Sequence, residues 1–332
     1  MKKILYLLTF LTLWGCSTSD ESPYNFATYH AEKSMDYKLE ETYKMLSQPE
    51  SYDLASYFVD GDLMLIGNRS KSSYGVDVQN IKTGEVLHHF YSWETKDSRD
   101  TIKSLVSDMA MNEKYIFLLQ NTSKIDVFSK TGYQYVTTIG TGKWNFTNKG
   151  LIAGNGLFLH NDQLFVRDRE KISVFNVGSL EDVAPGELAW VAFSATLPQN
   201  NYIVQFASYK GRIFFTDVVN KCLYSFEDKV YHQGEKIVID KRIDLDVEPW
   251  GICLVDGDIV ISAKNDKFYQ LVDASGNIEE FKVEGYSNRD LGRLFCDEHW
   301  FWFSDTSRNY ISKCSYQEKE PVVETPTEEN QQ

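Results

Sequence analysis

The stretch Leu164-Phe-Val-Arg-Asp168, followed by Ile172-Ser-Val-Phe175, decides the fold of this chain. It consists of an apolar run, an aspartate that ends the run, and a second apolar run. Two other stretches repeat this arrangement, namely Ile116-Phe-Leu-Leu-Gln-Asn121 before Ile125-Asp-Val-Phe128, and Ile213-Phe-Phe-Thr-Asp217 before Leu223-Tyr-Ser-Phe226. Short apolar runs separated by polar turns are typical of β-strands. The sequence therefore predicts a repeated unit made of short strands.

Weaker copies extend the repeat over most of the 332 residues. The markers of the six units are Asn68, Asn121, Asp168, Asp217, Lys264 (with Asn265) and Asp305, and they lie 53, 47, 49, 47 and 41 residues apart. A period of about 40 to 50 residues with several short strands in each repeat is typical of a β-propeller blade. We therefore expect an all-β, six-bladed β-propeller.

The fifth unit shows how the strands of one blade are arranged. Strands a, b, c and d of a blade run antiparallel from the central channel outward, and in this unit we expect them at 252–255, 259–263, 268–272 and 278–283. The turn between a and b is Asp256-Gly257-Asp258, and Asp60-Gly61-Asp62, Asn161-Asp162 and Lys210-Gly211 occupy the same place in other units. Asp-Gly between apolar runs is a strong hairpin signal. We interpret these carboxylates as turn residues rather than as a calcium site, because no further oxygen ligands follow them.

The sixth unit ends at Tyr310-Ile-Ser-Lys-Cys314 and lacks a strand d. Residues 317–332 are acidic, contain proline and are poor in apolar side chains, which predicts a disordered tail. The segment from Tyr37 to Leu46 precedes the first unit and has no blade of its own. We expect it to complete the last blade and so to close the ring, which removes exposed strand edges. The propeller is thus predicted to span residues 36–316.

The N-terminus has the layout of a secretory signal, with Lys2 and Lys3 before an apolar stretch at 4–14. That stretch is too short to span a bilayer, which needs roughly 20 residues. Leu13-Trp14-Gly15-Cys16 resembles a bacterial lipobox, which implies acylation of Cys16 after removal of a signal peptide at 1–15. Residues 16–35 would then be the lipidated Cys16 and a flexible tether. The alternative is an ordinary signal peptide in which Cys16 is incidental.

Two stretches resemble the NHL and TolB-like propellers: Ile139-Gly-Thr-Gly142 followed by 154–175, and Glu248-Pro-Trp-Gly-Ile252 followed by 256–273. Together with the lipobox, they make the chain similar to the six-bladed propeller lipoproteins of Bacteroidetes. Ser17-Thr-Ser-Asp20-Glu21 resembles the acidic surface-export tag of such lipoproteins, although a polar tether looks similar. The resemblance implies a lipoprotein in the outer membrane of a Gram-negative bacterium, either surface-exposed or facing the periplasm.

The net charge argues against nucleic acid as a partner, and the cysteine spacing argues against a metal site. The formal net charge of −14 argues against nucleic acid, which needs clustered lysine and arginine on one face. Beyond residue 16 the cysteines are Cys222, Cys253, Cys296 and Cys314, whose spacing is unlike that of a metal site. Each lies in or beside an apolar strand pattern, which favours buried free thiols. A disulfide such as Cys296 with Cys314 is the alternative.

Propeller topology predicts where ligands bind. We call the side with the b–c loops and d–a crossovers the loop face, and the side with the a–b and c–d hairpins the hairpin face. The predicted ligand-binding residues are all expected on the loop face: Arg69, Arg169 and Arg308 in b–c loops, and Trp144, Tyr202, Trp250 and Arg293 in crossovers. Aromatic rings and guanidinium groups suit sugars or carboxylates. Packing of the tryptophans between blades is the alternative for each of them.

Catalytic signatures are lacking, because the sequence contains no GxSxG or HExxH motif and its six histidines are scattered. Asp168, Asp217 and Asp305 are interpreted as turn residues that accept hydrogen bonds from nearby backbone N–H groups. The favoured function is a binding or scaffold module for a glycan, peptide or partner protein, without a cofactor. The alternative, implied by similar propellers, is a lactonase or lyase that holds a divalent cation at the channel mouth, with Glu248 as one ligand.

Overall fold

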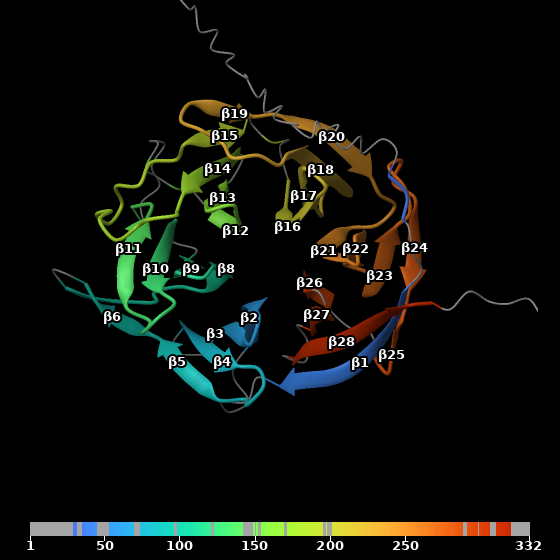
Figure 1. Ribbon diagram of the computed structural model, residues 1–332, viewed down its shortest axis with the longest axis horizontal. Coiled ribbons are helices and arrows are strands. Elements are labelled where there is room, and N and C mark those ends of the chain that lie inside the picture. The colour runs from blue at the N-terminus through green and yellow to red at the C-terminus, as the bar shows by residue number, and fades with distance from the viewer. Residues whose placement is uncertain are drawn as a thin grey trace, which may run out of the picture.

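The computed structural model is a ring of antiparallel sheets around a central axis (Figure 1). It describes residues 29–31, 35–44, 53–69, 74–95, 98–120, 123–141, 149, 151, 154–168, 171–194, 197, 201–287, 291–297, 299–305 and 310–319, with the side chains of 44, 53–55, 68, 69 and 155 left out. The predicted all-β, six-bladed propeller is confirmed. In the described residues all regular structure is β-strand.

The strands of each blade follow one another from the central channel outward. Blade one contains β2 (Asp53–Asp60), β3 (Leu63–Arg69), β4 (Tyr74–Asn80) and β5 (Val86–Phe90). Blade two contains β8 (Val106–Met111), β9 (Tyr115–Gln120), β10 (Lys124–Ser129) and β11 (Tyr135–Ile139). Blade three contains β12 (Gly154–His160), β13 (Gln163–Asp168), β14 (Lys171–Asn176) and β15 (Ala192–Ser194).

The other three blades have the same order. Blade four contains β16 (Ile203–Tyr209), β17 (Arg212–Asp217), β18 (Cys222–Glu227) and β20 (Ile239–Asp244). Blade five contains β21 (Pro249–Val255), β22 (Asp258–Ala263), β23 (Lys267–Leu271) and β24 (Ile278–Phe281). Blade six contains β26 (Leu291–Cys296), β27 (Trp300–Asp305), β28 (Tyr310–Glu318) and β1 (Met35–Lys44).

The ring closes through the N-terminal strand, as expected. β1 is antiparallel to β28, from Met35 opposite Glu318 to Lys44 opposite Tyr310. β28 ends at Glu318, two residues beyond the predicted end of the propeller at residue 316. Because the last blade combines strands from both ends of the chain, every strand of blade six must be in place before the ring is complete.

The a–b hairpins have the backbone geometry that their sequences predict. Positive φ angles occur at both residues of Asn161-Asp162 (51° and 55°), Lys210-Gly211 (42° and 79°) and Asp256-Gly257 (47° and 89°). Two successive positive φ angles define the type I′ turn, whose twist matches that of the flanking strands. These turns lie together on the hairpin face.

Four further strands lie outside the expected pattern. β19 (Glu235–Ile237) adds in parallel to β15, and β25 (Val283–Glu284) adds in parallel to β1, so blades three and six have five strands. β6 (Ser92–Glu94) and β7 (Arg99–Thr101) form a separate hairpin between blades one and two (Figure 1). Trp93 anchors this hairpin against Phe128 of blade two, with ring centroids 5.0 Å apart.

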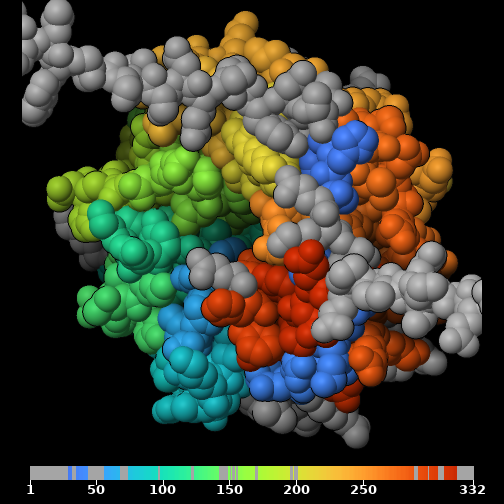
Figure 2. Space-filling model, turned by 45° about the vertical axis from the view of Figure 1, so that its right-hand side comes forward, coloured from blue at the N-terminus to red at the C-terminus, as the bar shows by residue number. Residues whose placement is uncertain are grey.

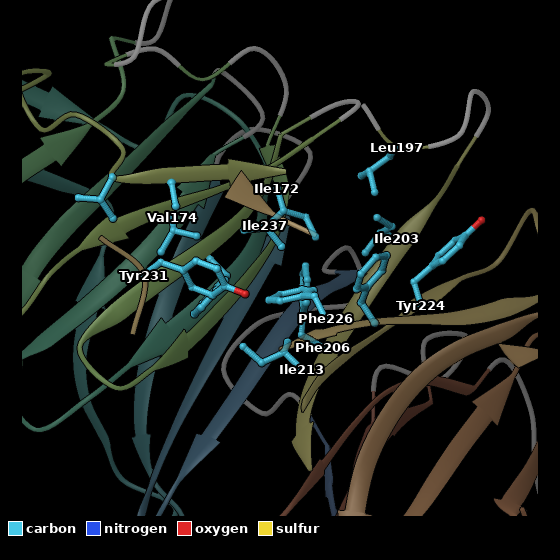
Figure 3. Close-up of a cluster of buried hydrophobic side chains, with 14 of the residues drawn as sticks. Ile172, Val174, Leu197, Ile203, Phe206, Ile213, Tyr224, Phe226, Tyr231 and Ile237 are labelled. Carbon is cyan, nitrogen blue, oxygen red and sulfur yellow. The ribbon is translucent and has the colours of Figure 1, made fainter. Parts of the chain in front are cut away.

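Apolar side chains fill the seams between neighbouring blades. Between blades three and four, Phe165, Phe206, Phe215 and Phe226 belong to one buried cluster, together with Tyr231 (Figure 3). One strand face of a blade cannot bury these rings alone, so each blade depends on its neighbour. Burial of a phenylalanine side chain contributes about 2 kcal/mol, which makes these seams the main source of stability.

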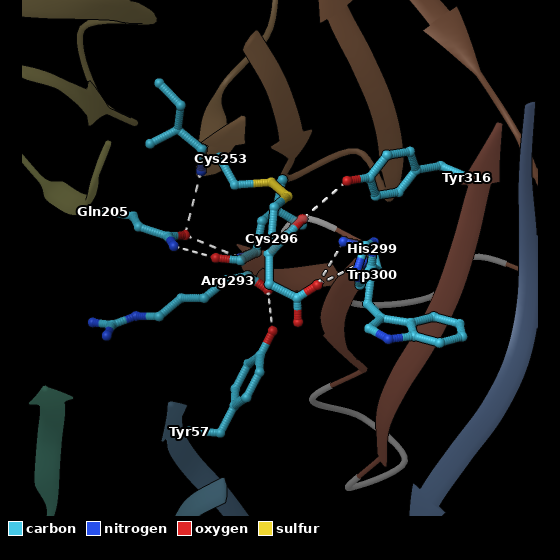
Figure 4. The surroundings of a disulfide bond; sticks show 11 residues. Tyr57, Gln205, Cys253, Arg293, Cys296, His299, Trp300 and Tyr316 are labelled. Atoms are coloured by element: carbon cyan, nitrogen blue, oxygen red, sulfur yellow. Dashed lines mark hydrogen bonds between the residues drawn. A yellow bond between two sulfur atoms is a disulfide. The ribbon is translucent and has the colours of Figure 1, made fainter. Parts of the chain in front are cut away.

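The inner strands of blades five and six are joined covalently. Cys253 on β21 and Cys296 on β26 form a disulfide, with Cα atoms 5.9 Å apart (Figure 4). The expectation of free thiols at these two positions is therefore wrong, as is the alternative pairing of Cys296 with Cys314. Cys314 lies on β28 and is a buried free thiol, as is Cys222. Adjacent inner strands bring together two cysteines that are 43 residues apart in the sequence.

Candidate functional site

Every inner strand has an irregular register close to its first residues. The register shifts lie between Leu54 and Ser56, Val106 and Asp108, Gly154 and Gly156, Ile203 and Phe206, Pro249 and Gly251, and Leu291 and Leu294. A β-bulge leaves a residue out of the ladder and re-aims its side chain. Trp250 and Arg293 occupy such positions, and so does Gln205 of β16. Two of the predicted ligand-binding residues, Trp250 and Arg293, thus lie at bulges of the inner strands.

Tyr202 and Trp250 form an aromatic pair on the loop face. Their ring centroids are 5.8 Å apart at an interplanar angle of 45°. Tyr202 is 42% exposed and Trp250 is partly buried. Tyr202 directly precedes β16 of blade four and Trp250 lies in β21 of blade five, so the pair spans the seam between these blades. We call these two residues the aromatic platform.

Hydrogen bonds from blade four hold the backbone of the aromatic platform. The Tyr202 N–H donates to Asp217 Oδ1 (3.1 Å), and the Thr216 hydroxyl donates to the Trp250 carbonyl (3.4 Å). Asp217 also accepts hydrogen bonds from Asn220, through the backbone N–H (3.2 Å) and the side-chain amide (2.7 Å). The interpretation of Asp217 as a turn residue thus agrees with its contacts, and the same carboxylate positions Tyr202.

The equivalent aspartates share this position in their blades. Asp168 pairs with Gly154, and Asp305 pairs with Leu291, as Asp217 pairs with Ile203. All three aspartates are fully buried. The residues that follow Asp168 and Asp305 in their loops lie outside the described part of the chain, so their role as turn residues stays a prediction.

Arg167 supports the aromatic platform from blade three and was not among the predicted site residues. Its guanidinium donates to the Asn201 carbonyl (3.3 Å) and side-chain oxygen (3.0 Å), directly before Tyr202. Arg167 is 8% exposed, and burial lowers its pKa. Its Nε atom is buried and has no hydrogen-bond partner in the part of the chain that the structure describes. The signal in the sequence was a charged residue directly after the apolar residues 164–166.

A cleft of about 330 Å³ lies among the loops of blades four and five, the two blades that carry the aromatic platform. Its lining is charged with both signs and consists of Lys221, Asp246, Val247, Glu248, Lys264 and Asn265. Lys264 Nζ lies 3.2 Å from Glu248 Oε2, and Glu248 is two residues before Trp250 in the sequence. The carboxylate proposed as a metal ligand therefore faces an ammonium group. Among the described residues, no group of three or more His, Cys, Asp and Glu side chains is arranged to hold a metal ion.

Arg293 does not join the aromatic platform. It lies in β26 rather than in a crossover loop, and its guanidinium crosses the channel to Asp108 on β8 of blade two. Asp108 also accepts hydrogen bonds from the N–H groups of Met109 (2.8 Å) and of Leu157 on β12 (2.6 Å). Burial raises the pKa of Asp108, whereas Arg293 opposes this rise. Arg293 and Trp250 were expected in crossovers, but both lie at the irregular starts of inner strands, β26 and β21, and the Arg293 guanidinium is paired with Asp108. A role of Arg293 in ligand binding stays a prediction.

Gln205 makes a second set of contacts around the channel. Its Oε1 accepts hydrogen bonds from the N–H groups of Ile252 (3.3 Å) and Leu294 (3.0 Å), and its Nε2 donates to the Leu294 carbonyl. One side chain of blade four thereby connects the inner strands of blades five and six. Gln205 and the Asp108–Arg293 pair fix the inner strands relative to one another.

The channel encloses a cavity of about 250 Å³. Its lining includes Asp108, Gln205 and Arg293 as well as many apolar residues from the inner strands, among them Phe58, Phe158, Leu254, Phe295, Cys253 and Cys296. Asp108 and Arg293 pair with each other and Gln205 bonds to the backbone of Ile252 and Leu294, which leaves apolar walls over much of the rest of the cavity.

Several predicted site residues lie outside the described part of the chain. Trp144, Arg169, Arg308 and the lipidation site Cys16 are among them, and of Arg69 only the backbone, at the end of β3, is described. Their roles stay predictions. No helix long and apolar enough to span a membrane occurs among the residues that the structure describes.

Comparisons with known proteins show the fold and leave the family open. No protein-family model matches the sequence, and no curated protein does. The β-propeller domain of Cps50 (Swd1) from Myceliophteria thermophila has a TM-score of 0.51 and 8% identity, covering 83% of this chain and 99% of that one. BamB from Moraxella catarrhalis has a TM-score of 0.46 and 11% identity, covering 81% and 74%. The computationally designed Ika8 protein has a TM-score of 0.45 and 8% identity, covering 77% and 69%.

Proposed function

We propose that this protein is a membrane-anchored binding or scaffold module that uses its loop face to hold a peptide or protein partner. The observation that carries the proposal is the aromatic platform of Tyr202 and Trp250, on the same two blades as a charged cleft. Exposed tyrosine and tryptophan side chains supply large contact areas at interfaces at a low cost in side-chain entropy. A rigid propeller holds them in a fixed geometry.

The charges of the cleft favour a peptide or protein over a neutral glycan. Lys221, Asp246, Glu248 and Lys264 present two positive and two negative groups in the loops of the blades that carry the aromatic platform. A polypeptide can offer both a ring or aliphatic group and charged groups of either sign, whereas a neutral sugar has no charge to match. Paired surface charges also select partners more than they add affinity. A glycan with a carboxylate remains the competing ligand class.

The anchoring part of the proposal rests on the lipobox resemblance at Leu13-Trp14-Gly15-Cys16. We propose that acylated Cys16 places the propeller at the outer membrane of a Gram-negative bacterium, as in the NHL and TolB-like propeller lipoproteins of Bacteroidetes that the sequence resembles. Two or more acyl chains are needed for stable anchoring. Metabolic labelling with a clickable fatty acid tests this directly, with Cys16→Ser as the variant that should lose the label.

A binding screen tests the loop-face part of the proposal. The soluble chain from residue 17 is screened against peptide and glycan panels by thermal shift, and the affinity of each hit is then measured by calorimetry. Tyr202→Ala should weaken binding at least about tenfold, as expected for an aromatic hot spot. Tyr91→Ala is the matched control, because Tyr91 is exposed to a similar extent (46% against 42%) but follows β5 of blade one. Equal affinity of the two variants would place the ligand elsewhere.

A further inference from the structure

Tyr29 is buried far from the strand that it precedes. Its side chain is 1% exposed, although it lies within residues 16–35, where a flexible tether was expected. The Tyr29 hydroxyl donates to the Leu271 carbonyl (3.0 Å) and accepts a hydrogen bond from the Ile259 N–H (3.2 Å). Its ring meets Tyr209 edge to face, with centroids 5.7 Å apart. These contacts hold the Tyr29 side chain in place against blades four and five; we call this arrangement docked.

The two residues after Tyr29 pair with blade five. The Ala31 N–H donates to the Val272 carbonyl (2.8 Å), and His30 forms an antiparallel bridge with Asp273. Tyr29 also belongs to the apolar cluster that fills the seam between blades four and five. In Figure 2 the described N-terminal residues, in blue, lie beside the yellow atoms of blade four and the orange atoms of blade five. Side chain and backbone therefore hold this segment at one place.

That place is on the hairpin face. Tyr209 ends β16 next to an a–b turn, Ile259 follows the a–b turn of blade five, and Leu271 ends β23 before the c–d turn. β1 also begins on this face, because Met35 pairs with Glu318 where strand d of blade six starts. The chain thus has two attachment points before the first blade, and both lie on the side opposite the aromatic platform.

We propose that docked Tyr29 turns the hairpin face toward the membrane and the aromatic platform away from it. The inference rests on the proposed lipidation of Cys16. Cys16 and Tyr29 are 13 residues apart, so a fully extended chain between them reaches at most about 47 Å. A tether that leaves from the seam of blades four and five keeps this side of the ring nearest to the lipid. The loop face is then free for a partner.

The membrane-facing side can be measured with two reporter positions. Ser275, exposed in the c–d turn of blade five, reports on the hairpin face. Val219, 57% exposed in the b–c loop of blade four, reports on the loop face. Each is changed to cysteine in the acylated full-length chain and labelled with a fluorophore. Cys222 and Cys314 are buried and should not take the label, which a chain without an added cysteine checks.

The labelled chains are bound to phosphatidylethanolamine–phosphatidylglycerol vesicles that carry a quencher on the lipid headgroups. We expect quenching at Ser275→Cys to exceed that at Val219→Cys at least about twofold, because quenching falls steeply with distance. In the Tyr29→Ala variant, quenching at Ser275→Cys and at Val219→Cys should become similar. Tyr29→Phe keeps the buried ring and should retain most of the difference, which separates docking from general stability.

Two outcomes overturn the proposal at different levels. Equal quenching at the two positions, or stronger quenching at Val219→Cys, on chains that sediment with the vesicles would overturn the orientation and leave the lipid anchor intact. Failure of the full-length chain to sediment, with the same result for Cys16→Ser, would overturn the anchoring proposal, and the orientation with it. If Tyr29→Ala fails to fold, the orientation is still decided by comparing quenching at Ser275→Cys and at Val219→Cys in chains that keep Tyr29.

Discussion

Arg293 of blade six pairs with Asp108 of blade two across the central channel, so this ion pair joins inner strands on either side of blade one. Their side chains are only 13% and 4% exposed. A buried pair of this kind is costly to break and contributes little when both partners are replaced together by apolar groups.

Arg293→Ala should therefore lower the free energy of unfolding by about 3 kcal/mol, because it leaves the Asp108 carboxylate buried without its partner. The double variant Asp108→Leu with Arg293→Met should lose much less. Urea unfolding followed by tryptophan fluorescence measures both. If the double variant lost as much stability as Asp108→Leu and Arg293→Met lose in sum when made singly, the pair would not be coupled.

Asp100 of β7 connects the β6–β7 hairpin to blade two through Lys124 Nζ (3.0 Å). Burial raises its pKa, but hydrogen bonds from Lys103, Thr101 and Lys124 outweigh this and lower it to about 2, from an ordinary 3.8. Because the pKa is lower in the folded state, the stabilisation is present above about pH 4 and is lost as the pH falls toward 2. Asp100→Asn should cost about 1 kcal/mol at pH 7 and clearly less near pH 2, where the carboxyl is about half protonated in the folded state.

Thermal unfolding between pH 7 and pH 2 measures this dependence, with the exposed Asp182→Asn as the matched control. A constant difference between Asp100→Asn and the unaltered protein across that range would contradict the assignment.

The Cys253–Cys296 disulfide closes a loop of 43 residues. In the chain-entropy model, a loop of this length corresponds to about 4 kcal/mol of stabilisation. We expect Cys253→Ser with Cys296→Ser to show most of this loss, and Cys314→Ala to show only the smaller effect of a buried cavity. Thiol titration should find Cys222 and Cys314 reactive after unfolding without reductant, and four reactive thiols of the propeller after reduction. Four without reductant would rule out the bond.

Trp250 should contribute to partner binding through its ring. Trp250→Ala should weaken the affinity for any loop-face ligand about tenfold or more, and Trp250→Phe should weaken it less, since part of the stacking surface remains. Trp300→Ala is the control, because Trp300 begins β27 next to an a–b turn on the hairpin face. Unchanged affinity of Trp250→Ala by calorimetry would remove the aromatic platform from the binding site.

Removal of metal ions with a chelator distinguishes the two candidate functions, a binding module and a metal-dependent lactonase or lyase. Glu248 faces Lys264, so we expect the melting temperature to stay the same after dialysis against a chelator. A bound ion stabilises the folded state, and its removal would lower the melting temperature. A drop that added divalent cation reverses would favour the enzyme.

Much of the fold could be predicted from the repeat alone. Short apolar runs, Asp-Gly turns and a period near 45 residues depend on local geometry, and so does the missing strand of the last blade, which β1 supplies. Tyr202 and Trp250 were also predicted, because topology places crossover residues on one face. Arg167 was missed, since a charged residue at the end of an apolar run does not reveal its partner, which in this fold is Asn201.

The sequence by itself determined the six blades, the closure by the N-terminal strand and the loop face that carries Tyr202 and Trp250. Only the tertiary structure decided that Arg293 crosses the channel to Asp108, that Cys253 pairs with Cys296 and that Tyr29 docks between blades four and five. Strand periodicity and turns are set by neighbours in the chain, which the sequence displays. Contacts between residues 43 to 242 positions apart depend on how the bulged inner strands and the two chain ends meet once the ring has closed.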